Sequence, residues 1–313
     1  MSIEYPIEIS ILITTYNHEK YIEESIESVL SQNIQCKYEI VITDDASSDK
    51  TPEIVQNFYN KYPDIFKPVY HSINIGSTPT VIETLERCKG KYIALLAGDD
   101  FFSDNNKLQI QYETLEADNE ISLCYTNAFT FYNGDYSNRF ISLKNHNYSH
   151  TFDLDYYVQK NGFYIPPITE MIRKSSIPPK FPEWIYNSFH FDWALNFFIL
   201  QNGKAQYLDI ITASYRIHKK SMSRTTNFVN ITMNGIELAK NLDKYFNFKY
   251  HILFNLQWRY QELTIFYFQK KNYFKALKAL LKSFLYNPIL IIKDIQFHKR
   301  IYNVLFKGLI IYD

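Results

Sequence analysis

Two adjacent carboxylates, Asp99 and Asp100, follow a run of apolar residues in the stretch LLAGDDFF, residues 95–102. Like charges this close are costly to ionise unless a cation, a hydroxyl group or water takes up the charge. A second acidic pair, Asp44 and Asp45, follows the apolar run that ends at residue 43. Each pair alone could form a turn or begin a helix, so the neighbouring residues must decide its meaning.

Polar residues also end the first apolar run of the chain. The stretch ISILITT (residues 9–15) leads into Thr14, Thr15, Tyr16 and Asn17, and Asn17 could cap the helix that follows. In a parallel sheet the carboxyl ends of the strands meet at one edge, where ligands bind. We therefore predict that this turn and the two acidic pairs line a single ligand site.

Strand and helix patterns alternate in the half of the chain that must position these residues. Predicted strands lie at residues 9–15, 38–43, near 69, 92–97 and 121–126, and predicted helices at 22–30, from 51 on, 81–88 and 105–116. The strands are short apolar runs, whereas the helices repeat apolar residues at helical spacing. This alternation predicts an α/β fold with a mainly parallel sheet and helices on both faces.

The segment at residues 190–209 contains a candidate catalytic acid. Its pattern predicts a helix, a terminating Gly203 and a strand. Asp192 lies near the helix start, where a carboxylate could simply stabilise the helix end. It could instead act as the general base that deprotonates an attacking hydroxyl group.

A basic cluster, YRIHKKSMSR (residues 215–224), follows that strand. Cations and hydroxyl groups at this density suit a diphosphate, which Arg216 and Ser221 would bind, and a neutral His218 could ligate a metal ion. The alternative is a basic loop in solvent with no ligand.

Composition excludes several classes of protein. The 313 residues include only eight glycines, and neither G-x-G-x-x-G nor the Walker lysine loop occurs. Cys36, Cys88 and Cys124 are far apart, which predicts neither a zinc site nor a disulfide framework. Residues 1–8 resemble no export signal, and no apolar stretch approaches the ~18 residues of a membrane span. We expect a cytoplasmic protein without a nucleic-acid partner.

The zero net charge hides an asymmetry. Residues 228–313 carry 13 Lys and Arg against 5 Asp and Glu, so residues 1–227 carry 20 against 28. We predict a ligand-binding domain at 1–227, with halves at about 1–127 and 128–227, and a helical extension at 228–313.

One helix of this extension is predicted to be amphipathic. Large apolar residues recur at helical spacing between residues 273 and 285, and Lys275, Lys278 and Lys282 occupy another face. The apolar face could pack on the rest of the protein. It could instead lie on an anionic membrane, which would make the protein peripheral on the inner face of the cell membrane.

Three stretches together resemble the nucleotide-sugar domain of the family-2 glycosyltransferases, which have the GT-A fold. They are ISILITTYNHEKYIEESIESVLSQ, YEIVITDDASSDKT and NIGSTPTVIETLERCKGKYIALLAGDD, and the resemblance covers roughly residues 7–225. It implies that Thr14 and Tyr16 lie beside the nucleotide base and that Asp45 accepts a hydrogen bond from the base ring. It also implies that Asp99 is the last residue of the Asp-x-Asp metal motif, with Asp100 beside it, and holds Mg²⁺ or Mn²⁺.

The sequence departs from the family pattern at three places. Ala97 replaces the first Asp of the metal motif, and Val81-Ile82 replaces a common Arg-Asn pair. Phe191-Asp192 keeps only the second member of an acidic pair. A weaker metal site, or another residue recruited as ligand, would follow from the first of these changes.

The resemblance implies an inverting glycosyltransferase. It would move a sugar from a nucleotide diphosphate donor, a UDP-sugar, to a hydroxyl group of a glycan or lipid-linked acceptor in surface polysaccharide or glycoconjugate synthesis. Two alternatives are a sugar nucleotidyltransferase, for which a glycine-rich phosphate loop is missing after the first strand, and a non-catalytic sugar-nucleotide or glycan-binding relative, suggested by Ala97.

Overall fold

The computed structural model describes residues 6–132, 150–160, 162, 164–218, 227–250 and 256–307. The chain divides into two compact units. The first contains residues 1–157, 163–187 and 191–221, and the second contains 158–162, 188–190 and 222–313. Ser221, which the sequence predicts to bind a diphosphate, lies outside the described residues.

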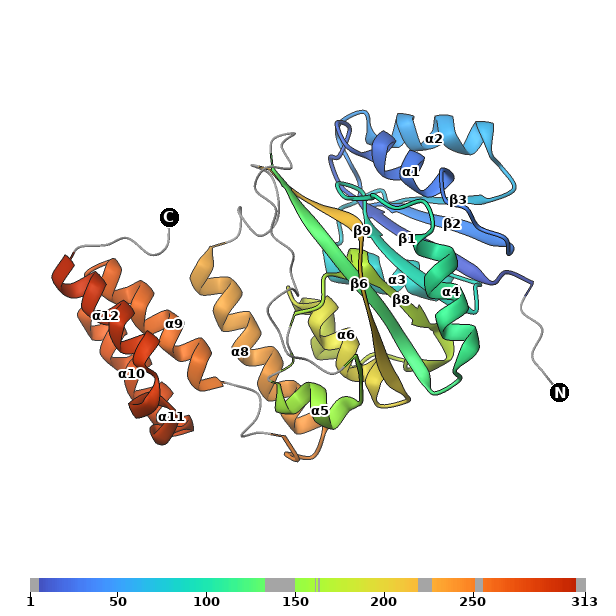
Figure 1. Ribbon diagram of the computed structural model, residues 1–313. Helices are drawn as coiled ribbons and strands as arrows, with labels where there is room; N and C mark the ends of the chain where they lie inside the picture. Colours follow the sequence, from blue (N-terminus) through green and yellow to red (C-terminus); the bar gives the residue numbers. More distant parts are fainter. Residues whose placement is uncertain are drawn as a thin grey trace. The chain divides into compact units, whose positions relative to one another are not determined.

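The first unit is built on a single mixed sheet (Figure 1). Its strand order is β3-β2-β1-β4-β8-β6-β9-β5, with β7 paired to β9. The strands are β1 (Ile9–Thr15), β2 (Tyr38–Asp44), β3 (Phe66–Tyr70), β4 (Tyr92–Ala97), β5 (Phe101–Phe102), β6 (Ile121–Tyr132), β7 (Thr151–Phe152), β8 (Glu170–Arg173) and β9 (Lys204–Ile217). Strands β1 to β4 pair in parallel, whereas β8 enters antiparallel between β4 and β6. The predicted α/β fold is confirmed, and its sheet is mixed because β5, β7 and β8 pair antiparallel with their neighbours.

Helices cover both faces of this sheet. They are α1 (Ile22–Leu30), α2 (Thr51–Lys61), α3 (Ser77–Arg87), α4 (Lys107–Ala117), α5 (Leu154–Gln159), which runs past the end of the unit, and α6 (Phe191–Leu200). Side chains alternate between the faces of a strand, so odd-numbered residues of β1 point to one side. Those residues pack with α1, α2 and α4 in one core. Thr43 of β2 points to the opposite side, where its hydroxyl accepts a hydrogen bond from Thr84 of α3.

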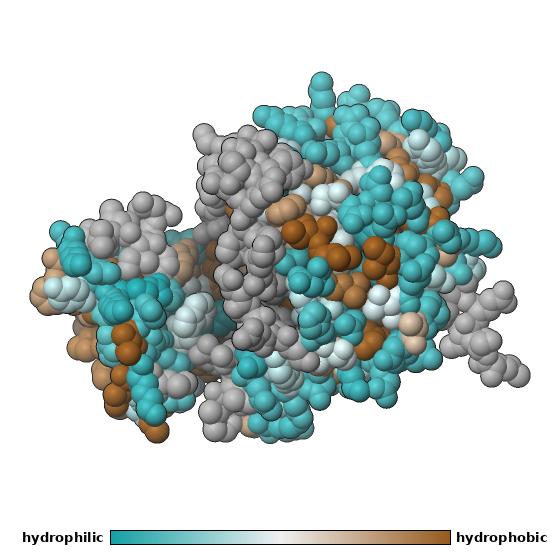
Figure 2. Space-filling model, viewed as in Figure 1, coloured by the Kyte–Doolittle hydropathy of each residue, from teal (hydrophilic) through white to brown (hydrophobic). Residues whose placement is uncertain are grey.

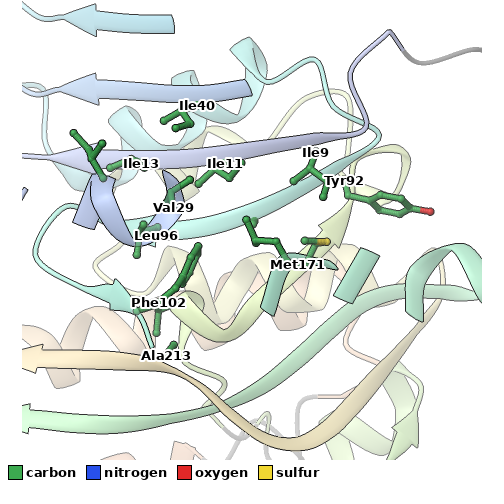
Figure 3. Close-up of a cluster of buried hydrophobic side chains, with 14 of the residues drawn as sticks. Ile9, Ile11, Ile13, Val29, Ile40, Tyr92, Leu96, Phe102, Met171 and Ala213 are labelled. Carbon is green, nitrogen blue, oxygen red and sulfur yellow. The ribbon is translucent and has the colours of Figure 1, made fainter. Parts of the chain in front are cut away.

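The core explains why the central strands form where they do (Figure 3). Ile9, Ile11 and Ile13 of β1 have no exposed surface, and Ile40 of β2 packs beside them. β-Branched side chains suit the pleated surface of a strand, and burial on both faces allows a nearly continuous apolar run. The same burial leaves the polar residues at the strand ends as the accessible chemistry of this sheet.

The second unit is helical, as predicted. It contains α8 (Phe228–Tyr245), α9 (Leu256–Gln269), α10 (Tyr273–Tyr286), α11 (Pro288–Lys293) and α12 (Ile295–Lys307). α9 packs against α8, α10 and α12. The fully buried apolar cluster here is small, with Ile265, Ile291 and Phe297 at its centre. Across the parts of the chain that the structure describes, no helix is both long and apolar enough to cross a membrane.

Candidate functional site

The carboxyl ends of β1, β2 and β4 lie next to one another, as the sequence predicted. The amide of Asp45 donates to the carbonyl of Thr15, and the amide of Gly98 donates to the carbonyl of Thr14, both at 2.9 Å. A Cβ atom at Gly98 would lie 2.7 Å from Thr15 Oγ1. Glycine is therefore required before the acidic pair for β4 to approach β1 this closely. Beyond the strand end, Tyr16 is half exposed.

Asp99 lies between two imidazoles. Its Oδ2 atom is 3.0 Å from His218 Nε2 and 3.8 Å from His18 Nε2. The three ligand atoms lie within 4.8 Å of one another, an arrangement that could hold a metal ion. Thr15 Oγ1 is 3.2 Å from His18 Nδ1, so the second ring nitrogen of His18 is also engaged, as in many metal-binding histidines.

The electrostatics of this cluster favour the forms that bind cations. Burial opposes ionisation of Asp99, but the hydrogen bond from His218 and the nearby imidazoles outweigh it and lower the pKa of Asp99. Burial lowers the pKa of His18, and the negative charge of Asp99 only partly opposes this effect. Neutral imidazole and ionised carboxylate are the ligand forms that a divalent ion requires.

Sequence reasoning placed Asp99, Asp100 and His218 at the metal, but the structure groups Asp99 and His218 with His18 instead. Asp100 is buried, and its Oδ1 atom accepts a 2.7 Å hydrogen bond from the amide of Arg216. Burial, followed by repulsion from Asp99, holds the pKa of Asp100 well above its ordinary value. A carboxyl group held in this way supports the position of β9 against the turn.

Arg216 is also committed to this turn. Its Nε atom donates to the carbonyl of Asp99 at 2.8 Å, and its guanidinium pairs with Glu24 at 2.5 Å. The guanidinium lies over the rings of Tyr21 and Phe101, 4.9 and 5.1 Å from their centroids. These contacts hold the backbone carbonyl of Asp99 in place. Arg216 therefore helps to position Asp99 within the cluster of His18, Asp99 and His218.

Two backbone amides and one imidazole contact the carboxylate of Asp45 at the end of β2. Its Oδ1 atom accepts from the amide of Ile75 and lies 2.9 Å from His71 Nδ1, while Oδ2 accepts from the amide of Gly76. Each carboxylate oxygen has two acceptor positions, so Oδ2 has room for one further donor. The carboxylate is therefore fixed in direction before any ligand arrives.

His71, which sequence reasoning missed, connects Asp45 to α3. Its Nε2 atom is 3.1 Å from Glu83 Oε2, and Glu83 pairs with Arg87 at 2.7 Å. A single histidine after a strand carries no spacing signal, so only the fold could reveal that it faces Asp45.

Asn17 holds two turns together. Its backbone is left-handed, with φ of 56°, and its side-chain oxygen accepts from the amide of Ser48 at 2.8 Å. The backbone N–H of Asn17 donates to Ser47 Oγ. Because its side-chain oxygen is used in this way, Asn17 shapes the rim between β1 and β2.

Asp192 lies in the first turn of α6, half-buried, and its Oδ1 atom accepts from the amide of Trp193. Its negative charge contributes to the raised pKa of Glu170 on β8, which is due mainly to burial. Glu170 accepts a 2.9 Å hydrogen bond from Asn196, one turn along α6 from Asp192. Phe191, the residue before Asp192, is buried. The start of α6 therefore offers one carboxylate, Asp192, beside a buried acid.

The model of glycosyl transferase family 2 matches residues 10–177 of this chain. The minor teichoic acid biosynthesis protein GgaA of Bacillus subtilis is 39% identical over 108 residues, which cover 33% of this chain and 24% of GgaA. The first curated relatives that the chain matches are aligned over about a third of their length.

Two solved structures share the fold. The S. aureus TarS 1–349 structure in complex with UDP-GlcNAc has a TM-score of 0.64 at 15% identity, covering 98% of this chain and 93% of that one. The mannosyltransferase PcManGT from Pyrobaculum calidifontis, in complex with GDP-Man and Mn²⁺, has a TM-score of 0.55 at 12% identity, covering 97% and 90%.

Proposed function

We propose that this chain, which belongs to glycosyl transferase family 2, moves a sugar from a UDP-sugar to a hydroxyl group of a glycan or lipid-linked acceptor. The observation that carries the proposal is the edge shared by the carboxylate of Asp45 and the cluster of His18, Asp99 and His218. One group suits a nucleotide base and the other a cation beside a diphosphate. Similarity to a teichoic acid biosynthesis protein supports a role in cell-surface polysaccharide synthesis.

Asp45 is the proposed reader of the base. Uracil presents an imide N–H, and the free acceptor position on Asp45 Oδ2 is a suitable partner for it. Thr14 and the exposed ring of Tyr16 would flank the base, and Asn17 would hold the surrounding turn.

The side chains of His18, Asp99 and His218 fit a divalent cation. His18 would supply the ligand that is lost because Ala97 replaces the first Asp of the metal motif. Two imidazoles and one carboxylate suit Mn²⁺ better than Mg²⁺, which prefers oxygen ligands. Bound there, the cation would stabilise negative charge on the departing nucleoside diphosphate. Ser221 is proposed to contact that diphosphate, with Arg216 acting through the Asp99 turn.

Asp192 is the proposed general base. It would accept the proton of the acceptor hydroxyl as that oxygen attacks the anomeric carbon from the side opposite the diphosphate. A single displacement of this kind inverts the anomeric configuration.

A reducing, cytoplasmic location is proposed for this chemistry. Cys36, Cys88 and Cys124 are all free thiols, and Cys88 and Cys124 are buried. A lipid-linked acceptor would bring the enzyme to the inner face of the cell membrane.

The test is donor binding followed by donor consumption. Calorimetry with UDP-sugars, each with and without Mn²⁺, should give tight binding only with the cation, and UDP should be released slowly without an acceptor. Asp99→Ala should abolish the effect of Mn²⁺, whereas the exposed control Asp64→Ala should preserve it. If the unaltered protein binds UDP equally well with and without Mn²⁺, the proposed role of the cation is refuted.

A further inference from the structure

The α10 helix packs through its small side chains. Ala276, Ala279 and Ser283 are its buried residues, and Ser283 Oγ donates to the carbonyl of Gln257 on α9 at 2.9 Å. Small residues on one face allow the two helices to approach closely. Leu280 also turns inward and packs against the cluster around Ile265.

The large apolar side chains of α10 point the other way. Phe274, Leu277, Leu281 and Leu285 recur at helical spacing and are 55–81% exposed. The apolar surface continues through Ile289 and Ile292 of α11 and Ile295 of α12, each at least 63% exposed. We call these seven residues the outer face. Figure 2 shows hydrophobic residues beside hydrophilic ones over the C-terminal helices.

The helices that carry the outer face are rich in positive charge. Residues 273–307 contain seven Lys and Arg but a single acid, Asp294. Lys275 and Lys282 lie over the rings of Tyr267 and Tyr260 on α9, so their ammonium groups stay close to the helix pair. Among the ion pairs of the described residues, Arg300 is the one of these seven that pairs with an acid, Glu262.

We propose that the outer face docks on an anionic lipid surface, with α10 and α11 lying in the plane of the headgroups. Exposed apolar surface of this extent is unusual for a protein that remains in water. Lipid headgroups supply negative charge for the lysines, while the acyl boundary receives the leucines and isoleucines. A second copy of this chain would instead bring two faces with the same positive charge together. This docking deepens the proposed function, because it would hold the enzyme beside lipid-linked acceptors.

Vesicle co-sedimentation of the full-length protein tests the docking. Vesicles of phosphatidylcholine alone are compared with vesicles containing about 30 mol% phosphatidylglycerol, at about 50 mM and about 500 mM salt. The unaltered protein should bind the anionic vesicles at low salt, and at high salt or on neutral vesicles it should bind at least tenfold more weakly.

Two sets of variants locate the docking surface. Leu281→Ser/Leu285→Ser should weaken binding to anionic vesicles at least tenfold. The matched control Ile210→Ser/Met233→Ser, which also removes exposed apolar side chains, should bind as the unaltered protein does. Lys275→Gln/Lys278→Gln should weaken binding by roughly fivefold per lysine and reduce the salt dependence.

Several results would overturn the proposal. They are equal binding to neutral and anionic vesicles, equal loss in the control variant, absence of vesicle binding, or a dimer in sedimentation velocity that the leucine variant dissociates. All variants should retain UDP binding, which separates failure of the docking from failure of the proposed function. Because the lysines are on the surface, their variant keeps the test valid even if the leucine variant folds poorly.

Discussion

The two units of this protein use apolar side chains in opposite ways. The first unit buries large apolar residues of its central strands, such as Ile11 and Ile13, and presents polar groups at the strand ends. In the second unit α10 buries alanine and serine and exposes phenylalanine and leucine. Helical or strand periodicity reveals that side chains share a face, but it does not reveal which face is covered.

This contrast assigns different tasks to the two surfaces. The polar edge of the first unit offers fixed charges and hydrogen-bond directions, which suits a small ligand. The outer face of the second unit offers area and positive charge without a fixed geometry, which suits a fluid surface. Changes in one region should therefore leave the task of the other intact.

The largest effect should come from Asp192→Asn. Removing a general base slows a reaction roughly 10²–10⁴-fold, so sugar transfer should fall by that factor while UDP-sugar binding and vesicle binding stay unchanged. Transfer rates measured with a water-soluble acceptor check this, with Asp64→Asn as the surface control. A near-normal rate would mean that another residue is the base, and a loss of vesicle binding would break the separation of the two regions.

The contrast in burial can be measured directly. Ile11→Ala should cost about 2–5 kcal/mol of unfolding free energy, because it opens a cavity in the core. Leu285→Ala should lower the free energy of unfolding by less than about 0.5 kcal/mol, because Leu285 is 81% exposed. Denaturant unfolding followed by circular dichroism gives both values. Similar costs for the two would show that the outer face is covered within the protein.

Asp45→Asn should weaken UDP binding by about 1–3 kcal/mol, the range for a hydrogen bond to a charged group. The amide would also face the backbone amides of Ile75 and Gly76, one of which would then lack an acceptor. Calorimetry with UDP measures the change, and vesicle binding should not move. Unchanged UDP affinity would show that Asp45 does not bind the base.

The smallest effect concerns Lys107, a fully buried lysine that donates to Gln111 Oε1 at 2.5 Å. Burial lowers its pKa from 10.5 to about 7. Between these values the unfolded chain binds more protons than the folded one, so stability rises with pH from about 7 to 10.5. Below about pH 7 both states are protonated, and the cost of burying this lysine no longer changes with pH.

From about pH 7 to about pH 8 the unaltered protein should gain about 1 kcal/mol relative to Lys107→Met. Denaturant midpoints at the two pH values measure the difference, and the exposed Lys20→Met is the control. Parallel pH profiles for Lys107→Met and the unaltered protein would contradict the buried, titrating lysine.

The central strands and their polar ends could be predicted from the sequence. Buried parallel strands are short apolar runs, and the residues after them must share an edge, so the sequence predicts that Asp45 and Asp99 follow neighbouring parts of one sheet edge, as they do in the structure. Short strands were missed: β5 has two residues and β8 four, too few to show a period. Together with the two-residue β7, these strands supply the antiparallel pairs that make the sheet mixed.

Two contributions of histidine could not be predicted. His18 and His71 are single residues in turns, and each gains its role from partners brought near by the fold, Asp99 and Asp45. The orientation of Asp100 depends on the amide of Arg216, 116 residues further along the chain. The sequence shows residue types and their local spacing, whereas these contacts depend on how distant strands meet.

The separation of Asp99 and His218 also has a consequence for synthesis on the ribosome. The two residues are 119 positions apart, a stretch that takes roughly 6–24 s to make at about 5–20 residues per second. During that interval the growing chain already contains β1 to β4 and Asp45 with its backbone partners, but the cluster of His18, Asp99 and His218 still lacks one imidazole. A chain interrupted before residue 218 therefore carries an incomplete site. The proposed cation site is thus completed only after β9 has been made and has docked beside the earlier strands.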